Sequence, residues 1–116
     1  DPYPPIGAWR AAKEAALREG EKHGKDMSTF WYGTFASALI VDASHPEAQR
    51  EQRKTLTGTA EQILDDLQKF ADEGYHHVTF HPHIQSATIE EFFEQVQRLG
   101  EEVLPEAKKI ATKPYC

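Results

Sequence analysis

The chain has 116 residues, which is enough for one folded domain but well short of the roughly 250 residues of a complete eightfold α/β barrel. Its 39% hydrophobic and 28% charged residues are typical of folded globular proteins rather than disordered ones. A net charge of −6 argues against nucleic acid or an anionic membrane as a partner. The apolar runs are too short for a membrane helix and the first residues do not resemble a signal peptide, so we expect a cytoplasmic protein.

The N-terminal part of the chain predicts a lead-in, a helix and a strand. Residues 1–7 are expected to be extended, because prolines stand at positions 2, 4 and 5. Apolar residues then recur at helical spacing from Trp9 to Leu17, and Gly24 provides a stop, which predicts a helix of about four turns. Residues 29–41 are apolar on both alternating faces. They predict a strand buried on both sides, as in a parallel sheet covered by helices.

Three later helix starts share one signature, a Ser or Thr followed three residues later by Glu or Gln. The pairs are Ser44 with Glu47, Thr59 with Gln62, and Thr88 with Glu91. In each pair, the two residues can satisfy the free amides of the first turn reciprocally. The mixed-charge run at residues 50–54 is expected to be a solvated helix face.

The second of these starts opens the clearest amphipathic helix. Its apolar stripe consists of Ala60, Ile63, Leu64, Leu67, Phe70 and Ala71. The charged residues at positions 61, 65, 66 and 69 are expected on the solvent face, so Asp66 is predicted to be exposed. Gly74 provides a left-handed exit from the helix.

After Gly74 the pattern changes to period two, which predicts a strand over residues 75–81. Val78 and Phe80 share one face of this strand, and His77, Thr79 and His81 share the other. A final helix follows and ends near Pro105, which leaves residues 106–116 as a tail. Its inward positions are predicted to be Ile89, Phe92, Phe93, Val96, Leu99 and Val103.

These elements predict a single α/β segment over residues 1–116, with two parallel strands and about four helices. A two-stranded sheet is only marginally stable and its free edges invite pairing, so we expect a missing partner segment or a homo-oligomer. The chain begins with Asp rather than Met, which fits a fragment of a longer protein. The single cysteine, Cys116, is expected to be a plain exposed thiol.

The second half of the chain resembles the luciferase-like flavin-dependent monooxygenases. Residues 56–67, 70–74 and 77–82 are similar to the C-terminal signature of that family: a leucine, threonine-glycine-threonine, a helix, an acidic-glycine turn and the last barrel strand. Residues 101–105 resemble its terminal helix and residues 35–42 its preceding strand. The resemblance covers most of residues 7 to 105.

The resemblance implies a partial TIM-type (β/α) barrel, the C-terminal fragment of an oxidoreductase that binds reduced FMN or the deazaflavin F420. In such enzymes the flavin lies at the carboxyl ends of the strands and carries the redox chemistry on a small-molecule substrate. The strands that supply most flavin contacts in the family are absent from this chain. We therefore expect the chain alone to bind no flavin and to be inactive.

Barrel geometry places the chemistry at the carboxyl ends of the strands, here near residues 41–44 and 81–85. His81 is the catalytic candidate, because a histidine there can hydrogen-bond a flavin or transfer a proton near neutral pH. A barrel-mouth histidine without a chemical task is the alternative. The cofactor-binding candidates are His81, His83 and Gln85. Asp42 and Ser44 are weaker candidates, since Ser44 is expected to cap a helix.

Other chemistries find less support. The histidines at positions 76, 77, 81 and 83 lack the further ligands of a metal site, so no metal is predicted. Three glutamates, at positions 90, 91 and 94, would repel a phosphate at the start of the last helix. No P-loop, nucleophile elbow or dinucleotide fingerprint is present. Two hypotheses stay open: a flavin-dependent monooxygenase active only with the rest of its barrel, and a non-catalytic self-associating module derived from a truncated barrel.

Overall fold

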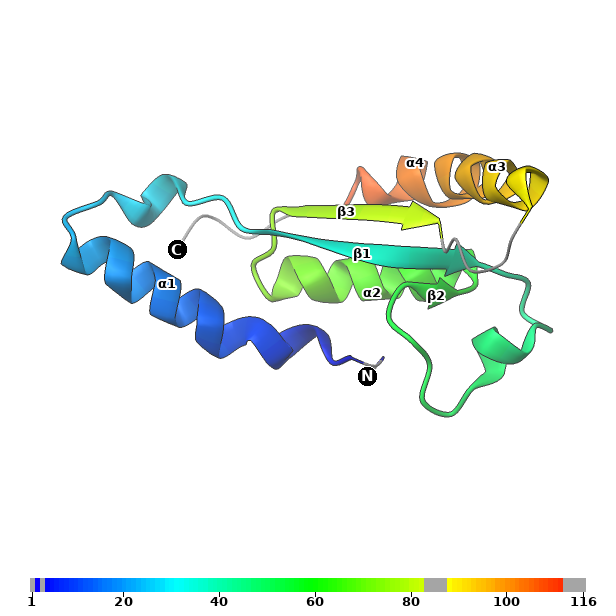
Figure 1. Ribbon diagram of the computed structural model, residues 1–116, viewed down its shortest axis with the longest axis horizontal. Helices are drawn as coiled ribbons and strands as arrows, with labels where there is room; N and C mark the ends of the chain where they lie inside the picture. The colour runs from blue at the N-terminus through cyan, green and yellow to red at the C-terminus, as the bar shows by residue number, and fades with distance from the viewer. Residues whose placement is uncertain (1, 3, 83–87, 112–116) are drawn as a thin grey trace.

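The computed structural model describes residues 2, 4–82 and 88–111. Its centre is one sheet of parallel strands in the order β2-β1-β3 (Figure 1). The strands are β1 (Gly33–Ile40), β2 (Thr57–Gly58) and β3 (His77–Pro82). β1 pairs with β3 from Gly33 opposite His77 to Ala38 opposite Pro82, whereas β2 pairs only with Leu39 and Ile40. The two predicted strands are therefore confirmed as parallel neighbours, and the structure adds a short third strand.

Helices flank this sheet along its length. The helical segments are η1 (Ile6–Trp9), α1 (Arg10–Lys22), η2 (Met27–Thr29), η3 (Pro46–Gln49), α2 (Ala60–Asp72), α3 (Ile89–Arg98), η5 (Leu99–Val103) and α4 (Leu104–Ala107). In Figure 1, α2 runs along the sheet, α3 and α4 lie beyond β3, and α1 lies on the opposite side of β1. Within residues 2, 4–82 and 88–111, none of the helices is long and apolar enough to cross a membrane.

The hydrophobic core lies on one face of the sheet. It consists of Ile6, Ala38, Ile40, Leu56, Ile63, Leu67, Phe70, Tyr75, Leu99 and Val103. Val78 and Phe80 pack against this core, as their period-two spacing predicted. The other face is not covered: Phe35 of β1 is 72% exposed, and Ser37 is exposed as well. The prediction of a strand buried on both sides is therefore wrong, because in the described chain the helical layer packs against the alternate residues only.

The start of α2 follows its sequence signature. The Thr59 hydroxyl accepts a hydrogen bond from the Gln62 amide at 3.2 Å, and the Gln62 side chain accepts one from the Thr59 amide at 2.9 Å. This reciprocal pair is the predicted capping box. At the other end of the helix, Gly74 has a φ of +88° and makes the predicted left-handed exit.

The signature at Ser44 gives a different result. His45, not Ser44, caps the short helix η3, because Pro46 begins the helix one residue later than predicted and the His45 Nδ1 accepts from the Glu47 amide at 3.1 Å. The helix ends at Gln49, so the expected helix face at residues 50–54 is also wrong. At the third signature, the Thr88 hydroxyl accepts from the Glu91 amide at 3.1 Å and starts α3 as predicted.

The orientation of α3 overturns part of the predicted core. Leu99 and Val103 of η5 are buried as expected, but Ile89 and Phe93 are 71% and 63% exposed. Phe92 and Val96 are exposed as well. The side chain that α3 turns toward the sheet is that of Gln95, which accepts a hydrogen bond from the Ile40 amide and donates one to the Ile40 carbonyl, both at 2.9 Å.

The physical reason for this orientation of α3 is that β1 extends beyond the last residue that pairs with β3. β3 last pairs at Ala38, so the backbone groups of Ile40 need another partner on that side. The Gln95 amide supplies both a donor and an acceptor. A polar residue is therefore placed against the sheet, and the apolar residues of α3 lie on the outer surface of the described chain.

Tyr75 gives the fold a measurable dependence on pH. The residue is 6% exposed, and its ring packs in a T-shaped arrangement against that of Phe70, with ring centroids 5.1 Å apart. Burial, with a smaller contribution from Tyr32, raises the pKa of Tyr75 to about 12. An unfolded tyrosine loses its proton near pH ~10, so the unfolded state ionises first and stability should fall as the pH rises from about 10 to about 12.

Urea unfolding at a series of pH values tests this expectation. The Tyr75→Phe variant is the control, because it keeps the ring and removes the ionisable hydroxyl. Its unfolding free energy should fall less than that of the unchanged protein between pH ~10 and ~12. Equal losses in the two proteins would show that Tyr75 does not carry the effect.

Candidate functional site

The uncovered surface of the sheet, here called the open face, carries aromatic, histidine and hydroxyl side chains. They are those of Phe35, Ser37, His77, Thr79 and His81. The His77 ring lies against Trp31 with centroids 4.8 Å apart, and the His81 ring lies against Phe35 at 5.4 Å. The His77 Nε2 is also 2.6 Å from the Thr79 hydroxyl. The open face thus combines flat apolar surface with polar ring nitrogens.

His81 stands at the carboxyl end of this face. It shares the face with His77 and Thr79, as the sequence predicted, and is partly buried. Its Nδ1 lies 3.2 Å from the Pro82 carbonyl oxygen. Because a carbonyl oxygen can only accept, Nδ1 donates in this bond, and in a neutral imidazole the other nitrogen, Nε2, is then a proton acceptor. The arrangement suits a general base. The other two predicted cofactor ligands, His83 and Gln85, lie outside the described residues.

The carboxyl end of β1 forms a separate polar site. The Asp42 carboxylate lies 3.2 Å from the Arg98 guanidinium, which also holds Glu102 at 2.7 Å. The hydrogen bond from Arg98 holds the pKa of Glu102 below its ordinary value. A cavity of about 330 Å³ adjoins Asp42 and Ser44, and it is lined by the described residues 39–42, 44, 45, 91, 94, 95 and 98. The structure therefore gathers Asp42 and Ser44 at a cavity that His81 does not line.

The histidines that lie close in sequence have separate surroundings. His76 accepts a hydrogen bond from the Tyr32 amide at its Nδ1, and its own amide donates to the Tyr32 carbonyl at 2.7 Å. His77 and His81 each lie against a different aromatic ring. Among the residues that the structure describes, no group of three His, Cys, Asp or Glu side chains is placed to hold a metal ion.

A buried ion pair that sequence reasoning missed positions the start of β2. Asp66 is fully buried and binds both terminal nitrogens of Arg53, at 2.7 and 2.8 Å. The same carboxylate accepts from the amide of Leu56 at 2.8 Å. Leu56 has a φ of +59°, a left-handed conformation that costs a non-glycine residue about 1–2 kcal/mol. Asp66 thus stabilises a strained turn immediately before Thr57.

The predictions for both partners of this pair are wrong. Asp66 was expected on the solvent face of its helix and Arg53 on a solvated helix face, but both are drawn into the interior. A signal was present in the sequence. Position 66 lies three residues after Ile63 and four before Phe70, so helical geometry places it next to these two residues, at the edge of the apolar stripe.

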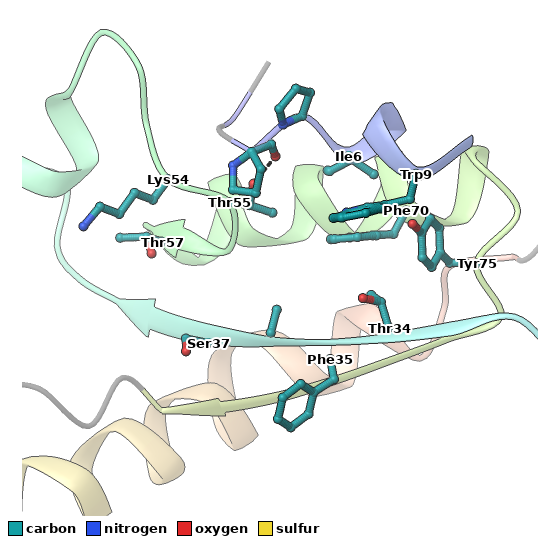
Figure 2. A pocket seen from close by; sticks show the side chains of 13 residues that line it. Ile6, Trp9, Thr34, Phe35, Ser37, Lys54, Thr55, Thr57, Phe70 and Tyr75 are labelled. Atoms are coloured by element: carbon teal, nitrogen blue, oxygen red, sulfur yellow. Dashed lines mark hydrogen bonds between the residues drawn. The ribbon is translucent and has the colours of Figure 1, made fainter. Parts of the chain in front are cut away.

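A second cavity lies beside β1, on the side of β2. Its volume is about 410 Å³, and the residues that line it come from the N-terminal segment, β1, the start of β2 with the loop before it, and α2 with the turn after it (Figure 2). They are Pro4, Pro5, Ile6, Trp9, Thr34, Phe35, Ala36, Ser37, Lys54, Thr55, Thr57, Phe70 and Tyr75. We call this cavity the β1 groove. Nothing in the sequence pattern singled it out, because its walls come from four distant segments.

No family model, no curated protein and no solved structure matches the chain. What the described residues establish is a mixed α/β fold with a parallel sheet that has one covered and one uncovered face.

Proposed function

We propose that this chain is the C-terminal wall of a luciferase-like, flavin-dependent oxidoreductase and that it acts only together with the rest of a TIM-type barrel. The observation that supports the proposal is the one-sided packing of the sheet. In a barrel of this type, helices cover the outer face of each strand and the inner face meets the other strands. The open face has the corresponding arrangement, with His81 at the carboxyl end of its strand, where barrel enzymes place their chemistry.

The side chains on the open face fit one part of a flavin. The Phe35 ring, which lies against His81, offers apolar surface to a planar ring system, and the His81 Nε2 offers a hydrogen-bond acceptor. A phosphate finds less support here, because Glu90 and Glu91 stand in the first turn of α3. The ring of FMN or F420 is thus the part that this chain contacts, and the phosphate belongs to the rest of the barrel.

In this proposal the flavin supplies electron transfer to oxygen or to a small-molecule substrate, and the chain supplies orientation and proton handling. His81 receives a proton at Nε2, while the Pro82 carbonyl holds Nδ1–H and so fixes the orientation of the ring. Phe35 packs against the His81 ring and limits its movement.

The test uses the complete polypeptide encoded by the gene. Its flavin affinity is measured by fluorescence quenching with FMN and with F420, and its turnover with the flavin that binds. We expect tight binding by the complete polypeptide and none at micromolar flavin by residues 1–116 alone. His81→Ala should lower turnover about 100-fold or more, within the range of general acid–base catalysis. The matched control is His77→Ala, at the amino end of the same strand, which should leave turnover within about twofold.

Two results would contradict the proposal: a complete polypeptide that binds neither flavin, or an upstream reading frame that encodes no barrel.

The second candidate function, a non-catalytic self-associating module, is favoured by the exposed apolar side chains Phe35, Ile89 and Phe93. Light scattering of the same preparations distinguishes it, because a stable monomer at all concentrations is incompatible with self-association.

A further inference from the structure

The position beside β1 that a neighbouring strand would occupy is only half filled. The Leu39 amide donates to the Leu56 carbonyl at 3.0 Å, and the Val41 amide donates to the Gly58 carbonyl at 2.9 Å. Alternate residues of a strand direct their backbone groups to the same side, so the amides and carbonyls of Phe35 and Ser37 also point toward this edge. Among the described residues, no strand pairs with β1 there.

The β1 groove lies directly along this half-filled position (Figure 2). In the figure, Thr34 points from β1 toward the N-terminal segment and α2, whereas Phe35 points to the other side of the strand. The buried side chains Ile6, Phe70 and Tyr75 form the apolar wall that faces Thr34. A side chain that entered the groove from an added strand would therefore be surrounded by apolar surface.

The far end of the groove, toward the carboxyl end of β1, is bordered by a hydrogen bond and by a lysine. The Thr55 hydroxyl donates to the Pro4 carbonyl at 2.7 Å, which joins the loop before β2 to the N-terminal segment. The exposed Lys54 lies at the same end, and its ammonium group points away from the apolar middle of the groove (Figure 2). A carboxylate on the ligand would be attracted to this end.

We propose that the β1 groove binds an extended peptide, added as a parallel strand along residues 33–37 of β1. The peptide spans about five residues, since a strand rises about 3.3 Å per residue. It places alternate apolar side chains against Ile6, Phe70 and Tyr75, and it ends in a carboxylate near Lys54. The unpaired backbone edge favours a peptide over a small apolar molecule, because only a peptide satisfies successive amides and carbonyls. The inference does not rest on the proposed function and concerns residues 1–116 alone, because in a closed barrel a neighbouring strand would occupy this edge of β1.

Titration of the chain with acetyl-Thr-Val-Thr-Val-Glu, which has a free carboxyl terminus, tests the proposal. Binding is followed by calorimetry and by amide NMR shifts, and the largest shifts should be those of Phe35 and Ser37. Two peptides methylated at alternate backbone nitrogens provide the matched comparison. An added strand turns only one of the two sets of amides toward β1, so one methylated peptide should bind at least about tenfold more weakly and the other within about twofold of the parent.

A second pair of variants tests the role of the positive charge of Lys54 at the end of the groove. Lys54→Glu should weaken binding about threefold, as expected for an exposed charge pair, whereas Lys25→Glu, on a distant exposed turn, should not change it. Absence of binding at millimolar peptide would overturn the proposal. Equal binding of both methylated peptides would also overturn it, because the peptide amides would then not pair with the edge of β1.

Discussion

Replacing Asp66 with alanine should lower the free energy of unfolding by about 3–5 kcal/mol, the range for removing one partner of a buried ion pair. The loss has two physical sources. The Arg53 guanidinium, whose side chain is only 14% exposed, would keep its charge without its bidentate partner. The amide of Leu56 would lose its acceptor, and with it a bond that holds the left-handed conformation of this residue.

Asp65→Ala is the matched control, because Asp65 is the preceding residue on the same helix and is exposed. It should change stability by no more than about 0.5 kcal/mol. Urea unfolding followed by circular dichroism measures both variants. If Asp66→Ala is too unstable for a folded baseline, Asp66→Asn keeps the shape and should give a smaller loss of the same sign. A loss no larger than that of Asp65→Ala would mean that the buried pair contributes nothing to stability.

Replacing Phe70 with alanine should have a comparable effect, a loss of about 3–5 kcal/mol. Phe70 is buried, contacts the edge of the Tyr75 ring and forms part of the wall of the β1 groove. Truncation removes most of a buried ring and leaves a cavity that the surrounding core fills only partly. For a domain whose total stability is about 5–15 kcal/mol, this is a large fraction.

Phe93→Ala tests the corrected position of α3. Phe70 and Phe93 are both phenylalanines on helices, but Phe93 is mostly exposed. At micromolar protein, Phe93→Ala should therefore lower the free energy of unfolding by no more than about 0.5 kcal/mol. Thermal unfolding monitored at 222 nm compares the two variants. Equal losses would show that the outer surface of α3 is buried in solution, against the structure.

Local sequence signals predicted the elements whose causes are local. The capping box at Thr59 and Gln62, the apolar stripe of α2 and the glycine exit at Gly74 all depend on residues within one helix. The alternation of Val78 and Phe80 with His77, Thr79 and His81 depends only on the pleat of a strand. For this reason these predictions agree with the structure.

The errors arose where distant residues compete for the same position. The apolar periodicity of α3 predicted a buried face, but the periodicity contains no information on the backbone groups of Ile40 that the Gln95 side chain satisfies. The cap at Ser44 was displaced because a proline fixed the first turn one residue later. Asp66 looked like a surface charge because its partner, Arg53, lies outside the helix.

For the candidate sites too, the sequence predicted one part and only the tertiary structure decided the rest. Sequence alone placed His81 at the carboxyl end of its strand, on the face that it shares with His77 and Thr79, since strand periodicity is enough for that. It did not predict the bond from Nδ1 to the Pro82 carbonyl, which leaves Nε2 as the proton acceptor. The β1 groove has no sequence signal at all. Its walls come from segments far apart in the chain, and only their tertiary arrangement leaves the edge of β1 unpaired beside an apolar cavity.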